Sequence, residues 1–156
     1  EAGDPVFTNT MGYLNRWAGG FGGPKVPHST VVIPEREADY EIKDAYPENA
    51  PLLYRLTGDT YPLHADPAFA KKAGFDRPIV HGLCSLGYAC RMMIGALFPG
   101  EPERMVSIEN QFRAVALPVD HFTLHVWKTG ENEALFRMVK DSDGKAILDY
   151  GRMTWK

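Results

Sequence analysis

The chain has 156 residues, of which 44% are hydrophobic and 24% are charged, and it carries a formal net charge of −3. These values are typical of one globular domain with its own core, and the slight negative charge lacks the basic surplus with which nucleic-acid-binding proteins neutralise phosphates. No apolar run approaches the roughly 20 residues of a membrane span, and no charged-then-apolar leader opens the chain, so neither a membrane protein nor a secreted protein is expected.

The sequence begins with a segment rich in glycine, proline and asparagine over residues 1–29. Residues 19–24 read GGFGGP, a composition that forms neither a regular helix nor a central strand. No apolar strand precedes these glycines, so a phosphate-binding loop is not indicated. We predict a linker over residues 1–29 and one folded domain over residues 30–156; the alternative is that the glycine-rich backbone lies close to a ligand.

Short elements are predicted in the first part of this domain. The β-branched residues of the run 30–34 predict a strand, and residues 40–43 continue it or pair with it. A short helix is predicted over residues 52–56, with Asn49 as its N-cap, because an Asn side chain can accept a hydrogen bond from the first free N–H groups of a helix.

Two further helices are predicted downstream. The first begins at Pro67, with Asp66 as its cap, and ends at Gly74, because proline is favoured at the first helical position and glycine just beyond the last. The second covers residues 82–97, where a proline–glycine pair follows. Its apolar residues recur at spacings of three and four, which predicts a buried central helix: Leu83, Leu86, Cys90, Met93, Ile94 and Leu97.

The two cysteines, Cys84 and Cys90, are six residues apart in this long helix. Positions with that separation lie on different faces of a helix, so a disulfide between them is not expected. Reduced, structural thiols are typical of a cytoplasmic protein, and a cytoplasmic location is predicted.

The rest of the chain predicts strands. The candidates are residues 106–116, 122–127, 134–139 and 146–155, and an Asp143–Gly144 turn joins the last two as a hairpin. One long apolar helix and an antiparallel meander bury each other best when the sheet wraps around the helix. The predicted fold class is therefore α+β.

The most informative stretch of the sequence places a carboxylate, Asp59, five residues before an imidazole, His64. Gly58 and Pro62 keep this stretch from being an ordinary helix from end to end. Two titratable side chains on a stiffened loop can converge on one water molecule, which suits proton-transfer chemistry. Taken alone, Asp59 would more often be a turn residue and His64 a structural histidine.

This stretch resembles the hydratase-2 motif of MaoC-like hot-dog proteins, above all the catalytic half of the hydratase in peroxisomal multifunctional enzymes. The family pattern reads roughly Tyr-Arg-Leu-Ser/Thr-Gly-Asp-x-Asn-Pro-Leu-His, and the chain matches it at every position but one. Several runs carry the resemblance: Tyr54 to His64, Asp66–Pro67, Gly74–Phe75, Pro78–Ile79 and His81–Gly82–Leu83–Cys84, with weaker likeness at residues 19–23, 112–113 and 127–130.

The resemblance implies a hot-dog fold and the reversible syn addition of water to a trans-2-enoyl-CoA, giving a (3R)-3-hydroxyacyl-CoA. It implies that Asp59 and His64 hold and activate the water and that the backbone N–H of Gly82 binds the thioester oxygen. A glycine at a helix start is suited to this role, because the unpaired N–H groups and the helix dipole favour negative charge. The candidates for binding substrate are Tyr61, Gly58, His81 and Arg91, with Arg104 and Lys72 as further candidates for the CoA phosphates.

The single departure from the pattern is Tyr61, where the family has Asn. A tyrosine ring that points into the pocket would reshape the preference for acyl chains, and one that points away would remove a hydrogen bond from the water or the catalytic pair. The alternatives that follow are a catalytically weakened hot-dog subunit that binds acyl-CoA, or a related dehydratase or thioesterase.

A single hot-dog domain leaves one sheet edge and its pocket open. We therefore expect a second hot-dog domain as partner, either in a homodimer or as a separate or upstream half. The expected reaction needs no cofactor. No metal is predicted, because His28, His121 and His125 lack the spacing of a metal site.

Overall fold

The computed structural model describes residues 3–13, 15, 17–24 and 29–156. Residues 1–2, 14, 16 and 25–28 of the predicted linker lie outside the described residues, and the boundary at residue 29 stays a prediction. The elements in chain order are β1 (Tyr40–Ala45), α1 (Ala50–Tyr54), η1 (Arg55–Thr57), η2 (Pro62–His64), α2 (Pro67–Lys72), α3 (Gly82–Leu97), η3 (Pro102–Arg104), β2 (Met105–Phe112), β3 (His121–Gly130), β4 (Glu133–Lys140) and β5 (Ala146–Trp155).

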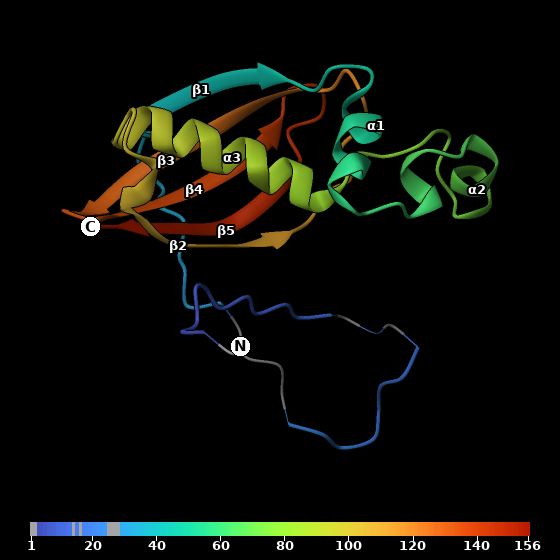
Figure 1. Ribbon diagram of the computed structural model, residues 1–156, viewed down its shortest axis with the longest axis horizontal. Helices are drawn as coiled ribbons and strands as arrows, with labels where there is room; N and C mark the ends of the chain where they lie inside the picture. The colour runs from blue at the N-terminus through green and yellow to red at the C-terminus, as the bar shows by residue number, and fades with distance from the viewer. Residues whose placement is uncertain (1–2, 14, 16, 25–28) are drawn as a thin grey trace.

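One five-stranded antiparallel sheet forms the body of the molecule. Its strand order is β1-β3-β4-β5-β2, so β1 and β2 are the two edges. Figure 1 shows the long helix α3 lying across one face of this sheet. The predicted hot-dog arrangement, a sheet wrapped around a central helix, is confirmed, and so are the bounds of the helix at residues 82 and 97.

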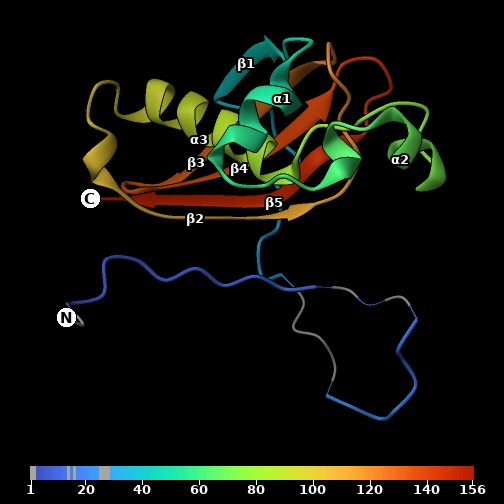
Figure 2. The same ribbon diagram turned by 45° about the vertical axis from the view of Figure 1, so that its right-hand side comes forward.

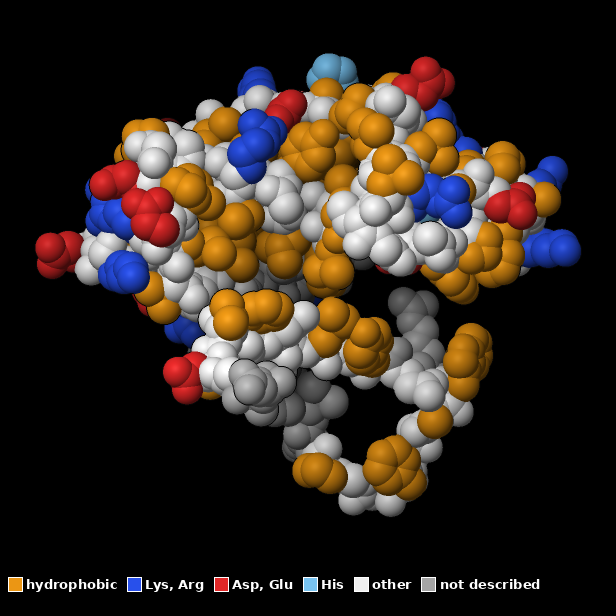
Figure 3. All heavy atoms as spheres, in the orientation of Figure 1, with side chains coloured by type: hydrophobic (Ala, Val, Ile, Leu, Met, Phe, Trp, Pro, Cys, Tyr) orange, Lys and Arg blue, Asp and Glu red, His pale blue; other side chains and the backbone are white. Residues whose placement is uncertain are grey.

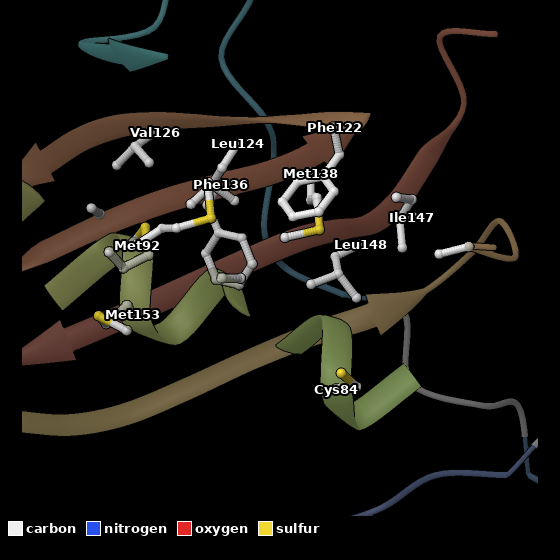
Figure 4. Packing of buried hydrophobic residues seen from close by; sticks show 14 of the residues in the cluster. Cys84, Met92, Phe122, Leu124, Val126, Phe136, Met138, Ile147, Leu148 and Met153 are labelled. Atoms are coloured by element: carbon white, nitrogen blue, oxygen red, sulfur yellow. The ribbon is translucent and has the colours of Figure 1, made fainter. Parts of the chain in front are cut away.

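The core fills the space between α3 and the sheet, as Figure 4 shows. Phe136 of β4 is fully buried there, and its ring occupies the place where a side chain on residue 151 would stand: a Cβ on Gly151 would lie 2.6 Å from the ring. The other buried members alternate along the strands and recur along one side of the helix, as periods of 2 and 3.6 require: Phe122, Leu124, Val126, Met138, Leu148, Met153, Met92 and Met93.

The start of α3 is fixed to the rest of the domain by two buried hydrogen bonds. The hydroxyl of Tyr46, just after β1, donates to the Ser85 hydroxyl at 2.8 Å, and burial raises the pKa of Tyr46. The N–H of Val80 donates to the carbonyl of Ala116 at 2.9 Å. Because buried polar groups are costly to leave unpaired, these bonds fix where the first turn of α3 points.

Residues 58–78 project beyond the end of the sheet, and α2 lies in this projection (Figures 1 and 2). Asp66 caps α2 as predicted, accepting from the N–H groups of Ala68 at 2.8 Å and Phe69 at 3.2 Å. Gly74 follows with φ of 90°, a left-handed conformation suited to glycine.

Three predictions about local structure are wrong. Residues 30–34 form no strand: no strand of the described sheet pairs with them, and Pro34 cannot donate to a ladder. The strand predicted over 106–116 ends at Phe112, and the chain continues irregularly to the next strand. Asn49 occupies the N-cap position of α1, but its side chain makes no capping hydrogen bond, and the α-helix ends at Tyr54.

No helix within the described residues is long and apolar enough to span a bilayer.

Candidate active site

The loop between η1 and η2 holds the carboxylate of Asp59. Gly58 precedes it with φ of 125°, a conformation that strains any residue with a side chain, and its N–H donates to the Arg55 carbonyl at 3.1 Å. The N–H of Tyr61 donates to Asp59 Oδ1 at 3.2 Å, in an Asx-type turn. Asp59 is thus a turn residue whose carboxylate has exposed acceptor capacity left. Gly58 shapes this turn, and its role in binding substrate stays a prediction.

His64 ends the short helix η2 and is half-buried. Its Nδ1 lies 2.9 Å from the carbonyl oxygen of Ile79. A carbonyl can only accept, so Nδ1 carries the hydrogen and Nε2 has the free lone pair. The backbone of the strand-like segment before α3 thereby fixes the tautomer that can act as a base.

His81, the residue before α3, joins the two predicted catalytic residues. Its ring stacks on that of His64, with centroids 3.7 Å apart and planes inclined by 22°. Its Nε2 lies 3.3 Å from the backbone carbonyl oxygen of Asp59. Only 1% of His81 is exposed, and burial, followed by the nearby His64, lowers the pKa of its imidazole. The structure therefore brings Asp59, His64 and His81 into one cluster.

A ligating atom of each of these three side chains lies within 4.8 Å of the other two. The distances alone would suit a metal ion. The nearly parallel rings, however, point their in-plane lone pairs side by side instead of toward one centre, and the Asp59 carbonyl occupies Nε2 of His81. The donor set fits a metal poorly, and the absence of a metal site stays a prediction.

The first turn of α3 begins at Gly82, directly after His81 of the cluster. The first hydrogen bond of this helix runs from the Ser85 N–H to the His81 carbonyl at 3.2 Å, so the N–H of Gly82 has no acceptor one turn earlier. No side chain caps α3, and its first turn contains no acidic residue. The positive end of a 16-residue helix is thus left without an anionic partner from its own sequence.

Gly82 is also covered by an aromatic ring from the edge strand. A Cβ at this position would lie 3.0 Å from Cδ1 of Phe112. A side chain here would have to push the ring back by a few tenths of an ångström, so glycine suits the close approach of β2. The sequence motif contained Gly82, but nothing in it indicated the contact with Phe112.

Tyr61, the residue that departs from the family pattern, stands beside His64. Its ring lies edge-on to that of His64, with centroids 6.3 Å apart, and edge-on to that of Phe69 of α2, at 5.4 Å. The side chain is 54% exposed. It borders the cluster and does not seal it.

His64 also lines a cavity of about 200 Å³. It is lined by charged Glu48 and Arg77 together with prolines and small apolar residues. Neither charged residue was singled out in the sequence, because no local pattern places them near His64: one follows β1 and the other follows α2.

Arg91, a predicted CoA-binding residue, lies further along α3. Its guanidinium pairs with the carboxylate of Asp44 and lies 5.3 Å from the centre of the Tyr88 ring. Arg91 and Tyr88 border a shallow hollow of about 280 Å³ that is also lined by Cys84, close to the start of the helix. Its role in binding phosphate stays a prediction.

The remaining candidates lie away from the cluster. Arg104 pairs with Glu101 at 3.0 Å, and Lys72 is exposed at the end of α2. His125 lies 3.2 Å from Glu41 on the sheet, and His28 is outside the described residues. Both cysteines are free thiols, as predicted, and burial raises the pKa of Cys84 to about 11.

Comparison with known proteins identifies relatives of this chain. The chain is 36% identical to enoyl-CoA hydratase ChsH3 of Mycobacterium tuberculosis, over 92% of this chain and 50% of the relative. It is 35% identical to probable enoyl-CoA hydratase 2 of Dictyostelium discoideum, over 97% of this chain and 52% of that protein. The crystal structure of a MaoC-like dehydratase from Phytophthora capsici superposes with a TM-score of 0.80 at 34% identity, covering 86% of this chain and 47% of that one.

The chain therefore spans about half the length of these curated relatives. It is also 37% identical to peroxisomal multifunctional enzyme type 2 of Mus musculus, over 84% of this chain and 18% of that enzyme. A family model described as a MaoC like domain matches residues 29–149. The chain belongs to the MaoC-like domain family.

Proposed function

We propose that this chain carries the catalytic residues of an (R)-specific 2-enoyl-CoA hydratase. The reaction is the reversible syn addition of water to a trans-2-enoyl-CoA, which gives a (3R)-3-hydroxyacyl-CoA. The relatives named enoyl-CoA hydratase support this activity. The observation that carries the proposal is the convergence of Asp59, His64 and the uncapped start of α3 within one cluster.

The cluster matches the needs of this reaction atom by atom. A water molecule can donate one hydrogen to Nε2 of His64 and the other to the carboxylate of Asp59, since both are acceptors. The water oxygen bonds to the β-carbon, and the π electrons of the double bond shift toward the α-carbon and the thioester oxygen. One proton passes from water to the pair, and one passes from the pair to the α-carbon, so the net change is the addition of one water.

The negative charge that develops on the thioester oxygen needs a fixed donor. The N–H of Gly82 supplies one, and the dipole of α3 adds to it. Donors of this kind typically contribute about 3–4 kcal/mol of transition-state stabilisation, and a positioned acid–base pair about 10²–10⁴-fold in rate. Both effects require that water be excluded from the rest of the site, which one open domain does not achieve.

A second hot-dog domain is the partner that would close this site. Among the described residues, no strand pairs with the free edge of β2, where Val106 is 62% and Phe112 is 49% exposed. Hydrophobic side chains are also exposed along α3 and around α1 (Figure 3). Exposed apolar edges of this kind favour pairing with another chain or domain. The half-length match to the relatives supports the same proposal.

The test is a hydration assay on the purified protein together with any second hot-dog domain that it carries or binds. Loss of the conjugated-thioester absorbance of short, medium and bulky trans-2-enoyl-CoAs is followed, and the product is analysed for chirality. We expect (3R)-3-hydroxyacyl-CoA as product. Release of free CoA without hydration would identify a thioesterase and contradict the proposal.

Two substitutions with matched controls assign the residues. Asp59→Asn and His64→Gln should each lower kcat at least 10²-fold with the fold intact. Asp66→Asn, in the same segment, should leave kcat unchanged, because Asn also caps a helix well, and His125→Gln should do the same from the sheet. Full activity of either catalytic variant would refute the assignment.

The alternative of an acyl-CoA-binding subunit without activity rests on Tyr61 alone. The Tyr61 ring is exposed at the border of the cluster and packs on Phe69, and its described contact with His64 is edge-on ring packing, not a hydrogen bond. The geometry favours activity over simple binding.

The cytoplasmic location inferred from the cysteines stays a prediction. The relative from Mus musculus is peroxisomal by name.

A further inference from the structure

His81 touches every part of the proposed catalytic arrangement without having a place in the reaction itself. Its ring contacts His64, its Nε2 contacts the Asp59 backbone, and its own backbone leads directly into Gly82. Groups from two separate stretches of the sequence thus have one residue, His81, as their common neighbour. This inference rests on the proposed hydration and adds a role to it.

The hydrogen bond of His81 acts on the backbone of the Asp59 loop. The Asp59 carbonyl can only accept, so Nε2 of His81 is the protonated nitrogen. Nδ1 is buried and has no hydrogen-bond partner, so a proton there would find no acceptor. The surroundings therefore select one tautomer, and that tautomer holds the turn that carries the carboxylate.

The ring of His81 acts on His64. Parallel stacking at 3.7 Å restricts the rotation of the His64 imidazole about its side-chain bonds, while the Ile79 carbonyl fixes the position of its Nδ1. Two contacts from different directions are enough to orient a planar ring. Loss of the stack would leave His64 free to rotate about the remaining hydrogen bond.

The neighbours of His81 come from four elements. They are Tyr54 of α1, whose ring lies 4.7 Å away, Arg55 of η1, Asp59 of the loop and His64 of η2. Burial and the approach of His64 lower the pKa of His81. A neutral His81 suits the reaction, because a second positive charge would oppose the proton that His64 takes from water.

We propose that His81 is a positioning residue: its Nε2–H holds the Asp59 loop and its ring holds His64, so that both face the water beside Gly82. It contributes to kcat through these two residues and does not exchange protons with the substrate. No sequence motif shows this role, because it depends on contacts between residues 22 and 17 positions apart.

Three substitutions separate the two contacts. His81→Gln keeps a donor near the position of Nε2, His81→Asn places its amide nearer the position of Nδ1, and His81→Phe keeps a flat ring without a donor. We expect His81→Gln, which loses only the stack, to lower kcat about 10-fold, and His81→Phe, which loses only the donor, about 10²-fold, because a displacement of about 1 Å at reacting groups costs about this much. His81→Asn loses both contacts and should lower kcat more than either. KM should change less than 3-fold in all three.

A role in stability alone would give a different pattern. The activity lost by the Gln variant and by the Asn variant would then each follow the fraction of that variant that is unfolded. Far-ultraviolet circular dichroism and urea denaturation measure this fraction. Equal losses of kcat in folded Gln and Asn variants would overturn the proposal. A rise in KM with kcat unchanged would also overturn it, since His81 would then be a substrate-binding residue.

A measurement on the unmodified protein keeps the proposal testable if the variants fail to fold. Nitrogen-15 NMR of histidine-labelled protein reports the tautomer of each ring. We expect the Nε2–H form for His81 and the Nδ1–H form for His64 at neutral pH. The opposite tautomer or an imidazolium for His81 would overturn the proposal, whereas the expected tautomers in a protein without hydratase activity would refute the proposed function and still support the placement of His81.

Discussion

The ring of Tyr61 packs edge-on against the ring of Phe69, with their centroids 5.4 Å apart. This contact holds the tyrosine against α2 at the border of the proposed catalytic cluster, where the family pattern has a short amide. On the proposed function, an aromatic wall at this place would limit the width of the acyl group that approaches His64.

Replacing Tyr61 with Asn should therefore change the choice of substrate. We expect Tyr61→Asn to raise the ratio of kcat/KM for a bulky, branched enoyl-CoA to that for crotonyl-CoA about 10-fold, a typical effect of removing apolar bulk from a pocket. Tyr61→Phe is the control and should leave the ratio unchanged, because it keeps the ring. An equal change in both variants would show that the hydroxyl, and not the ring, sets the preference.

Gly82 should tolerate no side chain. A Cβ there would stand 3.0 Å from the Phe112 ring, so Gly82→Ala must move either the ring or the first turn of α3. We expect kcat to fall about 10²-fold, as when an oxyanion donor is displaced. Gly95→Ala on the same helix meets nothing within 4 Å and should keep full activity, with stability raised by about 0.5–1 kcal/mol. Unchanged kcat in Gly82→Ala would remove the role of its N–H.

Arg91 lies nine residues beyond Gly82 on α3, about 13 Å along the helix axis. This separation is comparable to an extended pantetheine arm, so the guanidinium can meet a CoA phosphate. We expect Arg91→Gln to raise KM for an enoyl-CoA about 10-fold and to leave the hydration of the corresponding phosphate-free pantetheine thioester unchanged. Lys145→Gln, at an exposed cation in the turn between β4 and β5, is the control. Equal effects on both substrates would exclude contact with a phosphate.

The lowered pKa of His81 predicts how stability depends on pH. The unfolded chain takes up a proton on this residue below about pH 6.5, whereas the folded protein resists it, so the unfolded state binds more protons. The contribution of neutral His81 to the free energy of unfolding is complete above about pH 6.5, and it is lost as the pH falls through the lowered pKa of the folded protein. Urea denaturation should show a steeper fall in the free energy of unfolding between about pH 7 and 5 for the unmodified protein than for His81→Gln. Parallel curves would contradict this.

Most of the fold could be predicted because its signals are local. The apolar spacing of residues 82–97 and the alternation within β3 to β5 are direct consequences of helix and strand geometry. The strand predicted at 30–34 failed because β-branched residues favour a strand only where a partner strand lies alongside, and local composition does not show whether one does.

The site could be predicted only in part for a similar reason. Asp59, His64 and Gly82 belong to sequence motifs, so they could be predicted as site residues from the sequence alone. The stack of His81 on His64 and the ring of Phe112 over Gly82 are contacts across the fold. Such contacts leave no periodic pattern, and neither does the cavity between Glu48 and Arg77.

The proposed catalytic side chains all come from residues 59–82, and the loop, η2 and α2 within that stretch project past the sheet (Figure 2). The core between the sheet and α3 lies elsewhere and does not need this projection to stay packed. Regions with few buried contacts open at lower free energy than the core of a protein. Gentle warming should therefore abolish the proposed activity before the domain melts, and a preparation with an intact circular dichroism spectrum can still be inactive.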